Sequence, residues 1–118
     1  DREPWPLLVY LHGAGGGSLF GNNKKSLRSV GLQHAAANFV VLSPSCDWTW
    51  KEQPGTWVSE LVGHLRAADW IDHHRVYLAG CSMGGMGVWE VCAQAPHLFT
   101  AVVPVAAYHK EERRRDIA

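Results

Sequence analysis

VYLAGCSMGG, residues 76–85, is the stretch of sequence that decides the fold. Its first four residues are apolar, which predicts a buried strand, and a pattern typical of a helix begins at Met83. A strand that turns directly into a helix forces the residue between them, Ser82, into a strained backbone conformation. Crowding around such a turn leaves room for little more than glycine two residues before and two residues after, at Gly80 and Gly84. We therefore expect Ser82 to project from a sharp turn at the N-terminus of a helix.

A serine in this position has the environment of a nucleophile. Backbone N–H groups at a helix N-terminus stabilise negative charge, so the amide of Met83 can donate to the oxyanion of a tetrahedral intermediate. A second oxyanion donor is expected in the glycine-rich stretch that follows the first strand, HGAGGG at residues 12–17. The alternative for Ser82 is a serine in a tight glycine turn with no chemistry.

The rest of the chain predicts one α/β domain with a mostly parallel sheet of about four strands flanked by helices. Apolar runs that predict strands buried on both faces occur, besides the one at Val76, at residues 7–11, 39–42 and 101–106. Helix-length segments lie between the strands, at about residues 25–37, 56–70 and 83–95. Pro96 predicts the end of the last of these helices, and Pro104 belongs near the end or the edge of its strand.

Composition excludes several classes of function. The chain has 118 residues, 47% of them hydrophobic and 19% charged, as expected for a single globular domain spanning residues 1–118. Eleven basic residues balance eleven acidic ones, which disfavours a nucleic-acid partner. No stretch has the length of a membrane span or the pattern of a signal peptide, and the compartment is left open. The three cysteines lack the spacing of a disulfide framework or a zinc site.

The sequence resembles the α/β-hydrolase superfamily, most closely its esterase and peptidase-like branch related to polyhydroxybutyrate depolymerases, feruloyl esterases and phospholipase/carboxylesterases. The similarity is carried by residues 6–18, 39–50 and above all 75–109, and covers nearly the whole chain. It implies a partial three-layer sandwich and a serine hydrolase acting on a small or polymeric carboxylic ester, without a metal or an organic cofactor. The residue roles that it implies are a nucleophile at Ser82, an oxyanion hole formed by the amides of Met83 and Ala14, and a structural His12-Gly13 turn.

The resemblance also implies an acid and a catalytic histidine on loops after two further strands, whereas this sequence continues for about 36 residues beyond Ser82. We therefore expect an N-terminal segment of a longer enzyme, with little turnover of its own because a serine without a base is a weak nucleophile. The sheet would be a central slice with two open edges, which favours self-association. The alternatives are a non-catalytic binding module of the same fold, and a serine peptidase or acyltransferase.

Several residues have two interpretations. Trp48 and Trp50 follow the second strand and either line a substrate pocket or cap the core beneath a loop. His109 either replaces the missing base or is a solvated histidine at the start of a charged helix. The glycine-rich stretch at residues 13–21 lacks the spacing of a phosphate-binding loop. Cys81 is expected to be a small packing residue, and Val88, Trp89 and Cys92 are expected in the core.

A cluster of acidic and histidine residues precedes the third strand. It comprises Asp69, Asp72, His73 and His74. We expect these residues in a solvated turn at the end of the sheet opposite Ser82, and not in a metal site.

Overall fold

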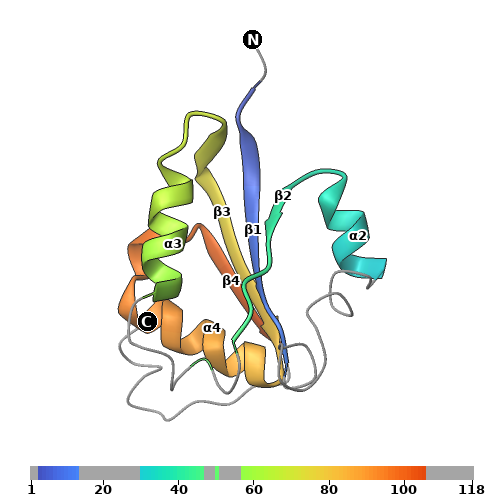
Figure 1. Cartoon of the computed structure of the whole chain (residues 1–118), viewed down its shortest axis with the longest axis vertical. Helices are drawn as coiled ribbons and strands as arrows, with labels where there is room; N and C mark the ends of the chain where they lie inside the picture. Colours follow the sequence, from blue (N-terminus) through green and yellow to red (C-terminus); the bar gives the residue numbers. More distant parts are fainter. Residues whose placement is uncertain (1–2, 14–29, 47–49, 51–56, 106–118) are drawn as a thin grey trace.

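The computed structural model describes residues 3–13, 30–46, 50 and 57–105. These residues form a four-stranded parallel sheet with helices on its two sides, as the sequence predicts (Figure 1). In chain order the elements are β1 (Trp5–Leu11), α2 (Val30–Ala36), β2 (Val40–Leu42), α3 (Trp57–Arg66), β3 (Ile71–Cys81), α4 (Met83–Gln94), the 3-10 helix η2 (Pro96–Leu98) and β4 (Ala101–Val105). The end of α4 at Gln94 agrees with the stop predicted from Pro96. No helix in the described ranges is both long enough and apolar enough to cross a bilayer.

The sheet has the strand order β2-β1-β3-β4, and every neighbouring pair is parallel. Leu7 lies opposite Val40 on one side and Val76 on the other, and Leu78 lies opposite Val102. All three pairings run in the same direction, so the carboxyl ends of the strands meet at one edge of the sheet. Ser82 follows β3 at this edge.

One face of the sheet forms the core. Leu7, Val9 and Leu11 of β1 and Val76 and Leu78 of β3 are fully buried. Helices α3 and α4 cover this face with four valines that belong to the same cluster, Val58, Val62, Val88 and Val91. Figure 1 shows α3 and α4 on one side of the sheet and α2 on the other.

The other face is only partly covered, which corrects the prediction of strands buried on both faces. Leu8, Tyr10, Tyr77 and Ala79 are half-buried there, and the outward positions of β4 are exposed, with Val103 at 54%. Among the described elements, only α2 lies on this side, and it packs against β2 at the far edge of the sheet. The apolar runs therefore reflect one buried face and one half-buried face.

The edges of the described sheet are β2 and β4. Pro104 lies in β4, at the edge as predicted, opposite Gly80. The carbonyl of Val105 accepts the N–H of Ser82 at 2.9 Å, so the backbone of the preceding residue, Pro104, is directed away from β3. Since proline lacks an N–H, it removes one donor from this edge and makes it a weaker template for another strand. Self-association through the edges stays a prediction.

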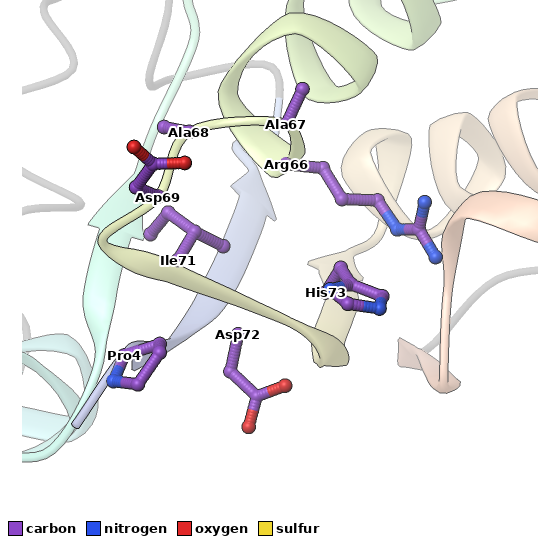
Figure 2. Close-up of a pocket in the computed structure, with 8 residues that line it drawn as sticks. All are labelled: Pro4, Arg66, Ala67, Ala68, Asp69, Ile71, Asp72 and His73. Atoms are coloured by element: carbon purple, nitrogen blue, oxygen red, sulfur yellow. The ribbon is translucent and has the colours of Figure 1, made fainter.

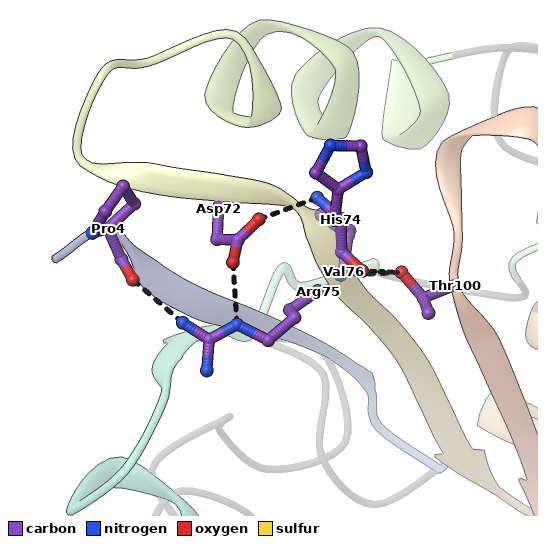
Figure 3. Close-up of polar contacts among 6 residues, drawn as sticks. All are labelled: Pro4, Asp72, His74, Arg75, Val76 and Thr100. Carbon is purple, nitrogen blue, oxygen red and sulfur yellow. Dashed lines mark hydrogen bonds and ion pairs between the residues drawn. The ribbon is translucent and has the colours of Figure 1, made fainter.

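β3 begins at Ile71, earlier than the expected start at Val76. Asp72, His73 and His74 therefore lie in the strand, and only Asp69 lies in the preceding turn, which corrects the assignment of all four residues to a turn. The strand extends this far because Ile71 pairs with Trp5 of β1, and the register is irregular between this pair and the next one, Leu7 with Val76. Hydrogen bonds hold the residues in between (Figure 3). The Nε of Arg75 donates to Oδ2 of Asp72 at 2.7 Å, and the N–H of His74 donates to Oδ1 at 2.9 Å.

Further hydrogen bonds of this network connect β3 to both neighbouring strands. The Nη2 of Arg75 donates to the carbonyl of Pro4 at 3.0 Å, just before β1. The hydroxyl of Thr100, just before β4, donates to the carbonyl of His74 at 2.8 Å and accepts the N–H of Val76 at 3.2 Å. The network therefore fixes the amino-terminal ends of three strands.

The start of α4 lies directly against the carboxyl end of β1. A Cβ atom on Gly84 would overlap the carbonyl oxygen of Leu11 and lie 2.9 Å from that of His12. A Cβ on Gly80 would overlap the carbonyl oxygen of Gly84 and lie 3.0 Å from that of Leu11. These contacts are between backbone atoms, which cannot move aside as a flexible side chain can. The crowding agrees with the prediction that only glycine fits at these two positions.

The Asp72 network predicts a pH-dependent contribution to stability. The hydrogen bond from Arg75, and after it the one from the His74 backbone, hold the pKa of Asp72 below its ordinary value of 3.8. A carboxyl whose pKa is lowered by folding stabilises the protein above its unfolded-state pKa, and this contribution disappears as the pH falls through the folded-state value. Asp72→Asn should therefore lower the free energy of unfolding in urea at pH 7 and have little effect well below pH 3.8. Asp69→Asn is the control, and a difference that persists unchanged into acid would contradict the account.

The glycine contacts predict opposite effects of alanine in two helices. Gly84→Ala should lower the free energy of unfolding by about 1–3 kcal/mol or more, because the new methyl group overlaps backbone atoms of β1. Gly63→Ala, in α3, should raise it by up to about 1 kcal/mol, because nothing lies within 4 Å of the new methyl group and alanine favours the helix. Urea unfolding of the two variants checks this, and similar effects of both substitutions would refute it.

Candidate active site

Ser82 is the single residue between the end of β3 and the start of α4. Its backbone has φ 57° and ψ −117°, and it is the only non-glycine residue of the described ranges with a positive φ. Its N–H donates to the carbonyl of Val105 at 2.9 Å, and its carbonyl accepts the N–H of Met86 at 3.0 Å. Hydrogen bonds from β4 and from α4 therefore hold the strained residue, and its side chain is exposed at the carboxyl edge of the sheet.

The turn after β1 lies beside this residue. A Cβ on Gly13 would lie 3.4 Å from the carbonyl oxygen of Cys81, the residue before Ser82. The structure therefore brings His12, Gly13, Gly80, Ser82, Met83 and Gly84 to one end of the sheet, as the sequence predicts. Met83 is the first residue of α4, and first-turn amides of a helix have no partner within the helix. Ala14, Trp48 and His109 lie outside the described residues.

His12 is completely buried, and both of its ring nitrogens are engaged. Nδ1 lies 2.6 Å from the carbonyl oxygen of Gly13, and Nε2 accepts the N–H of Cys46 at 3.1 Å. A ring nitrogen that accepts from an amide carries no proton, so the proton is on Nδ1, which donates to Gly13. The imidazole therefore connects the turn after β1 to the loop after β2, and neither nitrogen is free to take a proton from Ser82.

Trp50 is 6% exposed and belongs to the hydrophobic core. Its Nε1 donates to the carbonyl of His12 at 2.9 Å, and its ring stacks on Trp57 with centroids 6.0 Å apart. Of the two interpretations that the sequence allowed for Trp50, the structure shows the one in which the ring packs in the core. Little of the ring surface is left for a substrate. Gly87 makes this position of the Trp50 ring possible, because a Cβ on residue 87 would lie 2.6 Å from Cγ of Trp50.

The contact between Gly87 and Trp50 is absent from the sequence prediction. A glycine within a helix is a signal of close approach, but nothing in the sequence identifies the approaching side chain.

The cysteines differ in their surroundings. Cys81 is exposed, which corrects its assignment as a packing residue, because strand alternation directs it away from the core. Cys92 is buried as predicted, and burial raises the pKa of its thiol.

Of the other two residues of α4 that were expected in the core, Val88 is fully buried, whereas Trp89 is only half-buried. Tyr10 lies on the same face of the sheet as Cys81. Burial is the main cause that raises the pKa of the Tyr10 hydroxyl above 10.0, and the neighbouring Cys81 raises it further.

Metal ligands do not assemble in the described part of the chain. No group of three or more histidine, cysteine or acidic side chains within it is placed to hold an ion. The acidic and histidine cluster from Asp69 to His74 lies at and just before the start of β3 (Figure 2), at the opposite end of this strand from Ser82.

Comparison with known proteins places this arrangement among hydrolases. A crystal structure of a thermostable esterase superposes with a TM-score of 0.68 and 25% identity, covering 97% of this chain and 36% of its own. An S-formylglutathione hydrolase from Staphylococcus aureus gives a TM-score of 0.71 at 17% identity, covering 98% of this chain and 49% of its own. An acetyl xylan esterase from Aspergillus awamori gives a TM-score of 0.63 at 18% identity, covering 84% of this chain and 40% of its own. These structures share the α/β-hydrolase fold with this chain.

Sequence relatives agree with the structural ones. A bifunctional acetylxylan esterase/xylanase from Neocallimastix patriciarum is 31% identical over 106 residues, which cover 84% of this chain and 15% of the relative. The chain thus spans a small part of this curated relative and less than half of each solved structure. The prolyl oligopeptidase family matches residues 46–114, more than half of the chain. The chain therefore belongs to the prolyl oligopeptidase family of the α/β-hydrolase superfamily.

Proposed function

We propose that this chain carries the nucleophile of a serine hydrolase that acts on carboxylic esters. The observation that carries the proposal is the backbone of Ser82, held at φ 57° with its side chain exposed at the start of α4. A strained non-glycine residue persists only where its surroundings over-determine it, and such residues cluster at active sites. The Gly80–Gly84 turn is then a nucleophile elbow, in which the hydroxyl of Ser82 attacks the acyl carbonyl of the ester.

The proposed oxyanion hole consists of the amides of Met83 and Ala14. The amide of Met83 belongs to the first turn of α4, where the helix dipole also favours negative charge. Gly13, the residue before Ala14, lies beside the carbonyl of Cys81, which supports a second donor from this turn. The two N–H groups would stabilise the negative oxygen of the tetrahedral intermediate.

In this proposal the general base lies outside the described residues. His12 is the described histidine in the turn beside Ser82, and both of its ring nitrogens are engaged. The other described histidines belong to α2, α3, η2 and the start of β3. The base would be His109 or a histidine of a longer natural chain. It takes the hydroxyl proton of Ser82 as the new ester bond forms and returns it to the departing alcohol. Water then hydrolyses the acyl-enzyme, which releases the acid and regenerates the hydroxyl. If the base is not within these 118 residues, the chain alone turns over little ester.

The substrate class follows from the relatives, whose names are those of esterases that include acetylxylan esterases. A small or polymeric carboxylic ester is therefore the proposed substrate. The second candidate is a serine peptidase, which the match to the prolyl oligopeptidase family over residues 46–114 supports. Both reactions pass through the same acyl-enzyme and differ in the leaving group.

The test is covalent labelling of Ser82 by a fluorophosphonate, followed by intact and peptide mass spectrometry. It is applied to this chain and to the longest natural chain that contains it. Ser82→Ala should abolish the labelling, whereas Ser59→Ala, on α3, should leave it unchanged. If both chains are labelled and His109→Ala abolishes the labelling, the base is His109, within this chain. If only the longer chain is labelled, the base is a residue outside these 118 residues.

No labelling of Ser82 in either chain would contradict the proposal and favour a non-catalytic binding module. In the labelled chain, hydrolysis of an aryl acetate at least tenfold faster than that of a peptide anilide supports the esterase over the peptidase. The reverse order supports the peptidase.

A further inference from the structure

His12 is a buried polar residue that transfers no proton in the proposed hydrolysis. Its side chain has no exposed surface, and its ring lies against that of Trp50, with the ring centroids 5.0 Å apart. The carbonyl of His12 accepts the Nε1–H of Trp50 at 2.9 Å, so the same neighbour also holds the backbone of His12. These contacts fix the imidazole on the inner side of the turn that follows β1.

The loop after β2 decides which ring nitrogen of His12 carries the proton. An amide N–H only donates, and the N–H of Cys46 is directed at Nε2 at 3.1 Å, so Nε2 is an unprotonated acceptor. The proton of the neutral imidazole is then on Nδ1. The carbonyl oxygen of Gly13, 2.6 Å away, only accepts. The hydrogen bond from Cys46 therefore makes Nδ1 the donor to Gly13.

The carbonyl of Gly13 shares a peptide unit with the next N–H of the turn. This unit is planar, and in its trans form the C=O and the N–H point in opposite directions. Because the carbonyl points at the buried ring of His12, the N–H of the same unit points away from that ring. Gly13 lies beside Cys81, the residue before Ser82, since a Cβ on Gly13 would lie 3.4 Å from the Cys81 carbonyl oxygen. The unit is therefore a neighbour of the proposed nucleophile.

We propose that His12 is a positioning residue of the oxyanion hole: its Nδ1–H holds the peptide unit after Gly13 in the orientation that presents the N–H of Ala14 to the oxyanion. This inference rests on the proposed function and adds what orients the second donor. An oxyanion donor is effective because it is preorganised before charge develops. Gly13 has no Cβ to restrict its backbone, so a hydrogen bond from outside is needed to hold the unit.

Two substitutions separate the roles of the two ring nitrogens. The side-chain amide of asparagine takes the place of Nδ1 and that of glutamine the place of Nε2. His12→Asn therefore keeps a donor to Gly13, whereas His12→Gln keeps a partner for Cys46. A residue that merely connects two loops would make both variants equivalent. His64, exposed on α3, supplies the matched controls His64→Asn and His64→Gln, which should behave as the wild type.

The first experiment is NMR spectroscopy of the 118-residue chain. In the wild type, the ring ¹⁵N shifts should show a protonated Nδ1 and an unprotonated Nε2, and the opposite tautomer overturns the proposal without any variant. The residual dipolar coupling of the Ala14 N–H should be retained in His12→Asn and reduced in His12→Gln, while the couplings of β1 and β3 amides show that each variant is folded. A retained coupling in His12→Gln, or equal losses in both variants, also overturns it.

The second experiment is the rate of fluorophosphonate labelling of Ser82 in the longest natural chain that contains this one. Since loss of one oxyanion donor slows a reaction by about 10²–10³, misorienting it in His12→Gln should slow labelling by about tenfold or more, and His12→Asn by less than about threefold. Equal rates in the two variants overturn the proposal. No labelling of the wild type contradicts the proposed function and with it the catalytic role of His12, whereas the dipolar couplings decide separately whether His12 orients the turn.

Discussion

The direct backbone contact between the start of α4 and the end of β1 is the constraint on which the rest of the structure depends. There is no room for a side chain at Gly84, because a Cβ there would overlap the carbonyl oxygen of Leu11. The chain can bring α4 this close to the sheet only by turning within one residue, and Ser82 adopts a positive φ to make that turn. A conformation of this kind raises the energy of the folded state by about 1–3 kcal/mol. Packing of Val88 and Val91 against the sheet offsets this energy. The hydrogen bond from the N–H of Ser82 to the carbonyl of Val105 holds the residue in its strained conformation.

The same packing assigns structural roles to the residues around the turn. His12 connects two loops through both ring nitrogens, and Trp50 is bonded to the His12 carbonyl and seated against Gly87. Neither side chain is left free for proton transfer or for substrate. In our proposal the described residues therefore supply the nucleophile and one oxyanion donor, whereas the base comes from elsewhere. This division explains how the fold can hold Ser82 in place independently of any catalytic partner.

Local signals predicted most of the fold, and what they missed depends on how the chain is arranged in three dimensions. Continuous apolar runs and Pro96 located the strands and the end of α4, and the spacing of Gly80 and Gly84 around Ser82 located the turn. The polar start of β3 was missed because Asp72 and His74 look like turn residues, whereas the pairing of Ile71 with Trp5 becomes evident only in three dimensions. The exposure of Cys81 depends on which face of the strand is buried, which the apolar run did not reveal. No periodic pattern connects Trp50 to Gly87, so that contact could not be predicted.

The central claim is that the fold forces residue 82 into a strained backbone conformation, and comparing Ser82→Gly with Ser82→Ala tests it most directly. Both substitutions remove the hydroxyl, but glycine adopts a positive φ without the steric penalty of a Cβ, which is about 1–2 kcal/mol. Part of this gain is offset by the greater freedom of glycine in the unfolded chain. Urea unfolding should therefore show the glycine variant to be more stable than the alanine variant by about 1 kcal/mol. An alanine variant as stable as the glycine variant, or more stable, would contradict the account.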